Sequence, residues 1–132
     1  MEKNNLKFNM TELKNNPKVS IIMPVFNVER FLKEAIESIL DQTLKDFEFI
    51  IINDNSTDNS SKIIEEYRRK DDRIIIINNR QNLGIAKSLN LGLKIAKGKY
   101  IARMDGDDIS DKKRIEIQYN FLEKNKDIFL LG

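Results

Sequence analysis

The stretch Tyr100 to Ser110, Y-I-A-R-M-D-G-D-D-I-S, joins an apolar run to a loop rich in acids. The apolar run predicts a strand over 99–104, and the loop after it carries Asp105, Asp107 and Asp108. Three carboxylates so close together repel one another unless a positive charge lies among them. Acidic oxygens at alternate positions suit a hard divalent cation, Mg²⁺ or Mn²⁺, with positions left for phosphate oxygens. The stretch therefore predicts a metal-assisted site for a diphosphate ligand.

Two other interpretations of the acidic loop have to be considered. The acids could form a turn that caps a helix after Ser110, although a third aspartate there adds only repulsion. An EF-hand is excluded, because Ile109 stands at loop position five and Ser110 stands at position six, where glycine is needed.

The same alternation of apolar run and polar loop recurs along the rest of the chain. Strands are predicted at 19–25, 47–52, 73–77, 99–104 and 128–131. Between them, apolar residues at helical spacing predict helices after Asn27, after Asp58, over 84–96 and after Ser110 or Asp111. Strands that alternate with helices at this spacing imply an α/β fold, with a mostly parallel sheet and helices on both faces.

Length and composition limit the classes of function. At 132 residues the chain is long enough for one domain and too short for two. We expect a polar tail over 1–17 and a folded region over 18–132 that is truncated at its C-terminal end. There is no cysteine and no histidine, which excludes a Ser-His-Asp triad and a thiolate zinc site. Acid-base chemistry would therefore fall to carboxylates or to a lysine.

Charge and hydropathy give expectations for partners and location. The net charge of +2 gives no strong field that would favour nucleic acid. The longest apolar runs are far shorter than the ~18–20 residues that a transmembrane helix needs. The N-terminus lacks the apolar centre of a secretory signal. We expect a cytoplasmic protein, and peripheral attachment to the inner face of the membrane stays open.

Three polar loops follow predicted strands. They are Pro24 to Asn27, Asn53 to Asp58, and Asp105 to Asp108. In open parallel sheets, ligands bind beyond the carboxyl ends of the strands, so these loops would meet at one edge. Asp54 is explained either by an Asx turn before a helix or by a carboxylate that accepts a hydrogen bond from a nucleobase or ribose. Its pairing with the acidic loop favours the second interpretation.

A fourth loop carries a regular pattern of asparagine and glycine. The pattern N-x-G-x5-N-x-G comprises Asn82, Gly84, Asn90 and Gly92. Close packing of a helix on the sheet explains these glycines about as well as a ligand does. Lys87 and Arg103 could neutralise phosphate, although a basic residue near a loop is usually only solvated.

Four motifs, taken together and in this order, resemble family 2 glycosyltransferases. They are V-S-I-I-M-P-V-F-N at 19–27, I-I-N-D-N-S-T-D at 51–58, N-x-G-I-A-K-S-L-N-x-G at 82–92 and G-K-Y-I-A-R-M-D-G-D-D-I-S at 98–110. The resemblance covers about Lys18 to Gly132. It implies the Rossmann-like, nucleotide-binding half of the GT-A fold.

The resemblance also implies an activity. Such enzymes transfer a sugar, with inversion, from a nucleotide-diphosphate donor, often a UDP-sugar, to a glycan or lipid-linked acceptor in polysaccharide biosynthesis. Asp105 and Asp107 match the D-x-D motif, in which Asp107 would bind Mg²⁺ or Mn²⁺ and Asp105 would contact the ribose or metal-bound water. The acid matching Asp54 would contact uracil. The residues expected at the nucleotide sugar are Pro24, Val25, Phe26, Asn27, Asp54, Asn82, Gly84, Lys87, Arg103, Met104, Asp105 and Gly106, and those expected at the metal are Asp107 and Asp105.

The chain departs from the family pattern at two loops. Phe26 stands where a tyrosine is often found, which removes a hydroxyl but keeps an aromatic face. Asn53, Asp54 and Asn55 stand where two acids and a glycine are common, so a single carboxylate is left for base recognition. The catalytic base of the family lies beyond the position of Gly132, and Asp108 would be a poor substitute because a bound cation keeps it charged.

Other classes of protein share the predicted sheet. A nucleotidyltransferase would carry a Gly-rich basic loop after the first strand, which P-V-F-N-V-E-R lacks. A receiver-type signalling domain would carry acids after the first strand, where Asn27 stands. A nucleotide-sugar-binding module that is inactive on its own remains an alternative. The predicted apolar strand at 128–131 would lie exposed at the edge of the sheet, so we also expect self-association.

Overall fold

Strands and helices alternate along the chain, as the apolar periodicity predicts. The computed structural model describes residues 16–130, so nearly all of the predicted tail over 1–17 lies outside the described residues. The elements are β1 (Val19–Val25), α2 (Glu29–Leu40), β2 (Phe47–Asn53), α3 (Ser60–Lys70), β3 (Ile74–Asn78), α4 (Ile85–Ile95), β4 (Tyr100–Arg103) and α5 (Arg114–Lys124). Among the described residues, no helix has the length and apolar character needed to cross a membrane.

The four strands form one parallel sheet in the order β3-β2-β1-β4. β1 pairs with β2 from Val19↔Phe47 onward and with β4 from Val19↔Tyr100 onward. Every residue of β2 is buried, and so is every residue of β1 except the half-buried Pro24. Burial on both faces explains why these strands are near-continuous apolar runs in the sequence. The predicted α/β class is confirmed.

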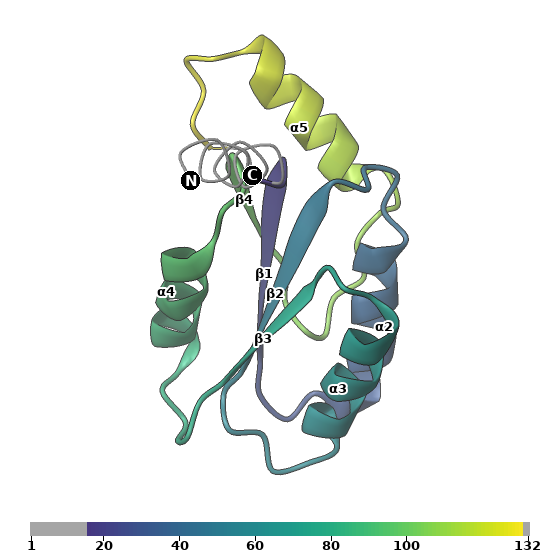
Figure 1. Ribbon diagram of the computed structural model, residues 1–132, viewed down its shortest axis with the longest axis vertical. Helices are drawn as coiled ribbons and strands as arrows, with labels where there is room; N and C mark the ends of the chain where they lie inside the picture. The colour runs from purple at the N-terminus through teal and green to yellow at the C-terminus, as the bar shows by residue number, and fades with distance from the viewer. Residues whose placement is uncertain (1–15, 131–132) are drawn as a thin grey trace, which may run out of the picture.

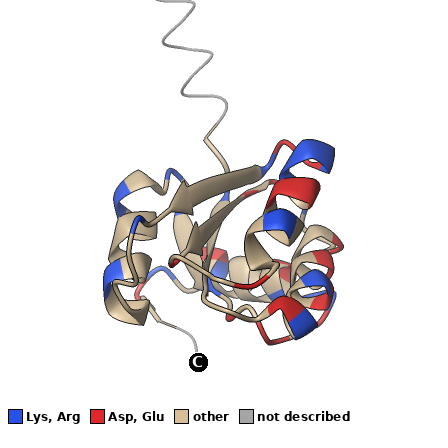
Figure 2. Ribbon diagram, turned by 90° about the horizontal axis from the view of Figure 1, so that it is seen from below, with Lys and Arg blue, Asp and Glu red and all other residues tan. Residues whose placement is uncertain are grey.

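Helices cover both faces of the sheet (Figure 1 and Figure 2). On one face, Ile21, Met23 and Phe49 join a large core that contains the buried residues of α2 and α3. On the other face, α4 packs against a smaller cluster, which contains Ile22, Ile50 and Ile52. The carboxyl ends of the parallel strands point the same way, so the loops that follow them gather at one edge.

Asn27 does not cap α2, although its residue type predicts a cap. The helix begins at Glu29, and Val28 occupies the cap position without a side-chain hydrogen bond. Asn27 has a φ of 50°, in the left-handed region that asparagine tolerates better than most residues. Its side chain is bonded to the loop after β2 instead.

α4 buries a different set of residues from the one that its apolar pattern predicts. Ser88 and Gly92 are its buried residues, and Leu89 and Ala96 are partly buried against the sheet. The apolar periodicity of this helix also predicts burial of Ile85, Ala86 and Leu93, and the structure exposes all three. The helix lies so close to β1 that a Cβ on Gly92 would come within 2.7 Å of Ile22 Cγ2. Small residues therefore make the closest contact with the sheet, while Ile85 and Leu93 lie exposed.

The C-terminal part differs from the prediction in two ways. α5 begins at Arg114, later than expected, and Asp111 stands before it with Oδ1 accepting the N–H of Lys113 at 2.9 Å. The fifth strand predicted over 128–131 is wrong for residues 128–130, and Leu131 lies outside the described residues. The sheet of the described residues is made of β1 to β4 alone.

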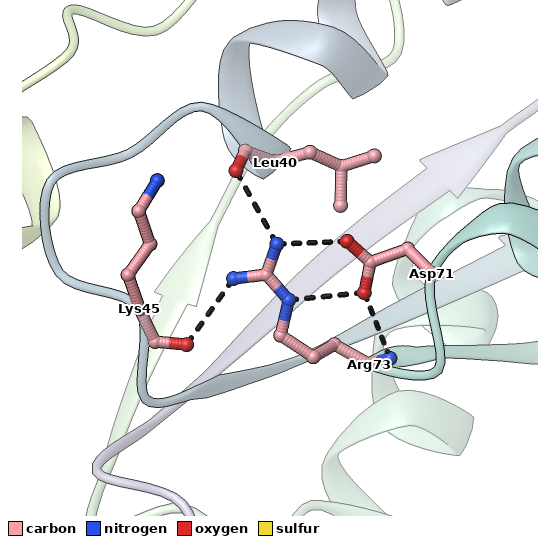
Figure 3. A network of polar contacts seen from close by, with 4 residues as sticks. All are labelled: Leu40, Lys45, Asp71 and Arg73. Atoms are coloured by element: carbon pink, nitrogen blue, oxygen red, sulfur yellow. Dashed lines mark hydrogen bonds and ion pairs between the residues drawn. The ribbon is translucent and has the colours of Figure 1, made fainter.

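Arg73 fixes the start of β3 at the amino ends of the strands. Its guanidinium pairs with Asp71 at 2.8 Å and donates to the carbonyls of Leu40 and Lys45 (Figure 3). It also lies over the Phe47 ring, 4.3 Å from the centroid. The hydrogen bonds from Arg73 hold the pKa of Asp71 below its usual value. This cluster joins α2, β2 and β3 at the edge opposite the polar loops.

Candidate functional site

Hydrogen bonds join the first two loops at the carboxyl edge of the sheet. The side-chain oxygen of Asn27 accepts the backbone N–H of Thr57 at 2.8 Å and that of Asp58 at 3.3 Å. The Asn27 amide nitrogen donates to Thr57 Oγ1 at 3.2 Å. Beneath this contact, the N–H of Asp54 donates to the carbonyl of Val25 at 2.8 Å. The two loops therefore form one surface, although about 30 residues separate them in sequence.

The acidic loop lies against the same surface. A Cβ on Gly106 would come within 3.0 Å of Val28 Cγ2 and 3.6 Å of the Pro24 carbonyl oxygen. A side chain at this position would therefore require Val28 or the loop to shift slightly. The structure thus brings together all three loops that the sequence predicts at this edge.

Three carboxylates of the acidic loop come close together. Asp105, Asp107 and Asp108 each offer an oxygen, and these oxygens lie within 4.8 Å of one another. Asp107 and Asp108 are exposed, whereas Asp105 is half-buried and its Oδ1 accepts Arg103 Nη2 at 3.1 Å. Carboxylate oxygens are the ligands that Mg²⁺ and Mn²⁺ prefer, and a cation would relieve their repulsion. The residues present therefore fit a divalent cation.

Asp54 is bonded to the loop that precedes α4. Its Oδ1 accepts the N–H of Leu83 at 2.7 Å and Asn79 Nδ2 at 2.9 Å, and its Oδ2 accepts the N–H of Gly84 at 2.9 Å. The residue is only 4% exposed. Burial alone would raise the pKa of this carboxyl, but the hydrogen bonds outweigh burial and the pKa lies below its usual value. Gly84 adopts a φ of 89°, which lets the loop turn its N–H groups toward Asp54.

The remaining predicted residues differ in what they expose. The side chains of Val25 and Met104 belong to the hydrophobic core, so only their backbone groups are available to a ligand. Phe26 is 47% exposed beside the loop contact, and both Asn82 and Lys87 are exposed. The site surface is therefore built from exposed acids, one exposed aromatic ring and backbone groups.

Two neighbours of the acidic loop are not found by sequence reasoning. Arg114 donates from Nη2 to the carbonyl of Arg103 at 3.1 Å, and Gln42 is fully buried behind the loop. One sequence feature could have drawn attention to Arg114. It is a basic residue at the start of a helix, where the helix dipole disfavours a positive charge. The signal for Gln42 is weaker, because a glutamine after a helix is usually solvated.

The fold and the site together define a class. A parallel sheet with helices on both faces, and with acids gathered beyond its strand ends, is a Rossmann-like α/β fold of the GT-A type. The model of Glycosyl transferase family 2 matches residues 20–132, and the chain belongs to that family.

Known proteins agree with this assignment. An uncharacterized glycosyltransferase of Methanocaldococcus jannaschii is 50% identical over 117 residues, which cover 87% of this chain and 40% of that protein. The minor teichoic acid biosynthesis protein GgaB of Bacillus subtilis is 40% identical over 119 residues, covering 89% of this chain and 13% of that protein. The crystal structure of Staphylococcus aureus TarS 1–349 with UDP has a TM-score of 0.76 at 29% identity, covering 83% of this chain and 33% of TarS. The chain thus spans less than half the length of these proteins.

Proposed function

We propose that this chain forms the donor-binding half of a glycosyltransferase that takes a sugar from a nucleotide diphosphate. The observation that carries the proposal is the meeting of three loops, after β1, β2 and β4, around exposed carboxylates at the carboxyl edge of the sheet. TarS, a similar protein, has been crystallised with UDP and with UDP-GlcNAc. A UDP-sugar is the donor that we propose.

The loop after β1 and the loop after β2, which contains Asp54, would hold the nucleoside. Phe26 offers an exposed ring on which a base can stack. Asp54 Oδ2 accepts one hydrogen bond whereas Oδ1 accepts two, so Oδ2 keeps a lone pair for an N–H of uracil. The same carboxylate keeps residues 83 and 84 in place, so it would shape the site as well as contact the base.

The acidic loop would hold the diphosphate through a divalent cation. Asp107 is the proposed ligand, and Asp105, which already pairs with Arg103, would contact the ribose or a metal-bound water. When bound, Mg²⁺ or Mn²⁺ supplies Lewis-acid stabilisation of the charge that develops on the leaving diphosphate. Arg103 adds a positive charge beside the same loop.

The direction of attack and the acceptor are part of the proposal. We infer an inverting reaction on a hydroxyl of a glycan or lipid-linked acceptor, in the synthesis of a polysaccharide. A carboxylate outside the metal loop would have to take the proton from that hydroxyl, because a metal ligand is held ionised and is a weak base.

Calorimetric titration of UDP into the 132-residue chain, with and without Mn²⁺, tests the proposal. We expect Mn²⁺ to strengthen UDP binding and Asp107→Ala to remove that effect, because Asp107 would hold the cation whose charge stabilises the diphosphate. Asp127→Ala is the matched control, since Asp127 is an exposed aspartate beyond α5. UDP binding that ignores both Mn²⁺ and Asp107→Ala would contradict the metal role, and absence of UDP binding would contradict the donor site.

A further inference from the structure

The segment that follows the acidic loop is fastened by Gln42, two residues after the end of α2. The Gln42 side chain is fully buried. Its Nε2 donates to the carbonyl of Asp111 at 2.6 Å, and lies 3.1 Å from the Ser38 carbonyl oxygen and 3.3 Å from Ser110 Oγ. Its Oε1 accepts the N–H of Ile115 at 3.1 Å. One side chain therefore holds both the return of the acidic loop and the first turn of α5.

Two neighbours of Gln42 strengthen the same contact. Ser38 Oγ accepts the N–H of Ser110 at 3.0 Å. The N–H of Thr43 donates to the carbonyl of Lys112 at 3.0 Å, and Thr43 Oγ1 donates to Glu116 at 2.8 Å. The end of α2 and the residues just after it are thus hydrogen-bonded to residues 110–116 through both backbone and side chains.

The acidic loop is consequently anchored at both ends. At its start, the N–H of Met104 donates to the carbonyl of Ile22 at 3.0 Å, and the Met104 side chain is buried in the core. At its end, Ser110 is held by Ser38 and Gln42. Carboxylates that repel one another move apart when their backbone is free, so their spacing depends on these anchors.

We propose that Gln42 is a positioning residue, which sets the place of Asp107 and Asp108 without contacting a ligand. The role requires an amide, because one group must donate to the Asp111 carbonyl while another accepts the Ile115 N–H. The part of this inference that concerns metal affinity rests on the proposed function. The part that concerns the loop stands on the contacts alone.

The variant Gln42→Met tests the inference, because methionine fills a similar volume but makes none of these hydrogen bonds. Tyr67→Phe is the matched control. It removes a different hydrogen bond of α2, the 2.5 Å bond that Tyr67 of α3 donates to Glu37. Ser38→Ala is a milder second variant in case Gln42→Met does not fold. It loses the acceptor of the Ser110 N–H and the bond that Ser38 Oγ donates to the Ala35 carbonyl within α2.

The first readout is amide hydrogen exchange over residues 105–113, measured without metal and alongside urea unfolding. We expect faster exchange there in Gln42→Met and, less strongly, in Ser38→Ala, while Tyr67→Phe leaves it unchanged. The second readout is Mn²⁺ affinity, measured by electron paramagnetic resonance. We expect a loss of about tenfold or more in Gln42→Met, as for other residues that orient metal ligands, and no loss in Tyr67→Phe.

The outcomes separate this inference from the proposed function. Exchange like that of the wild type in both loop variants would overturn the inference, and so would an equal change in Tyr67→Phe. Faster exchange with unchanged Mn²⁺ affinity would also overturn it, because the carboxylates would not depend on the anchor. If the wild type binds no Mn²⁺, the proposed metal site fails, while the exchange readout still decides whether Gln42 positions the loop.

Discussion

The carboxylate of Asp54 is almost fully buried, and hydrogen bonds from the loop before α4 keep it ionised. Its three hydrogen-bond donors are two backbone N–H groups and the amide of Asn79. Since the pKa in the folded protein lies below the usual 3.8, the ionised group stabilises the fold above that pH. The contribution shrinks as the pH falls below 3.8 and is lost below the pKa of the folded state.

We predict that Asp54→Asn lowers the free energy of unfolding by about 2 kcal/mol at pH 7, because the backbone N–H groups of Leu83 and Gly84 lose a charged acceptor. Urea unfolding of both proteins between pH 7 and pH 3 checks this. The difference between them should narrow toward pH 3, because Asp54 of the unfolded wild-type chain becomes protonated as the pH falls below 3.8. A difference that stays constant over this range would mean that the charge of Asp54 is not what holds the loop.

At the scale of elements, the connection from α4 to β4 depends on close backbone contact. A glycine just after a helix is typical of a C-cap, which predicts that role for Gly98, but α4 ends at Ile95 and Ala96 is the cap residue. The glycine is needed because a Cβ there would lie 2.4 Å from the backbone nitrogen of Ser20. Its N–H donates to Ser20 Oγ at 2.8 Å, so the contact also ties β4 to β1.

We therefore predict that Gly98→Ala destabilises the protein by about 1–3 kcal/mol, because the added methyl meets backbone that cannot rotate away. Thermal or urea unfolding measures the effect. Lys97→Ala is the control, since it changes an exposed neighbour and keeps the backbone N–H that Lys97 donates to Glu48. Equal stability of the wild type and Gly98→Ala would show that β1 and β4 can separate at little cost.

Sequence patterns predict the strands of this fold but not all contacts of its helices. The runs around Ile21 and Ile51 are apolar throughout, so their strands and the α/β order are predictable from composition alone. The buried face of α4 is not, because Ser88 and Gly92 are selected by the distance to β1 rather than by hydropathy. The capping role of Asn27 fails for a similar reason, since Thr57 offers its side chain better partners across the loops. Contacts between distant segments leave no local signal.

The same limit applies to the site. Spacing of acids predicts the loop with Asp105 and Asp107, and parallel strands predict that it meets the loop with Asp54. The hydrogen bonds between Asp54 and the loop before α4 join distant segments, so the spacing of residues in the sequence does not predict them. The contribution of Gln42 is hidden because its partners follow about 70 residues later in the chain.

For the whole molecule, exposed apolar residues at the C-terminal end predict association. Phe129 and Leu130 are 92% and 86% exposed, and they border a groove of about 640 Å³ between β4 and α5. Light scattering at rising concentration should show self-association of the 132-residue chain, and Phe129→Glu should reduce it. A monodisperse wild-type monomer across the range would contradict this prediction.

The central claim is that three loops at one edge of the sheet form a single donor site. Nuclear magnetic resonance of the ¹⁵N-labelled chain, with UDP and then Mn²⁺ added, tests it most directly. We predict that UDP shifts the amides of residues 25–28, 54–57 and 83–85, and that Mn²⁺ then broadens those of 105–108 first. Shifts centred on α5, or broadening that begins at acids outside the loop after β4, would contradict the account.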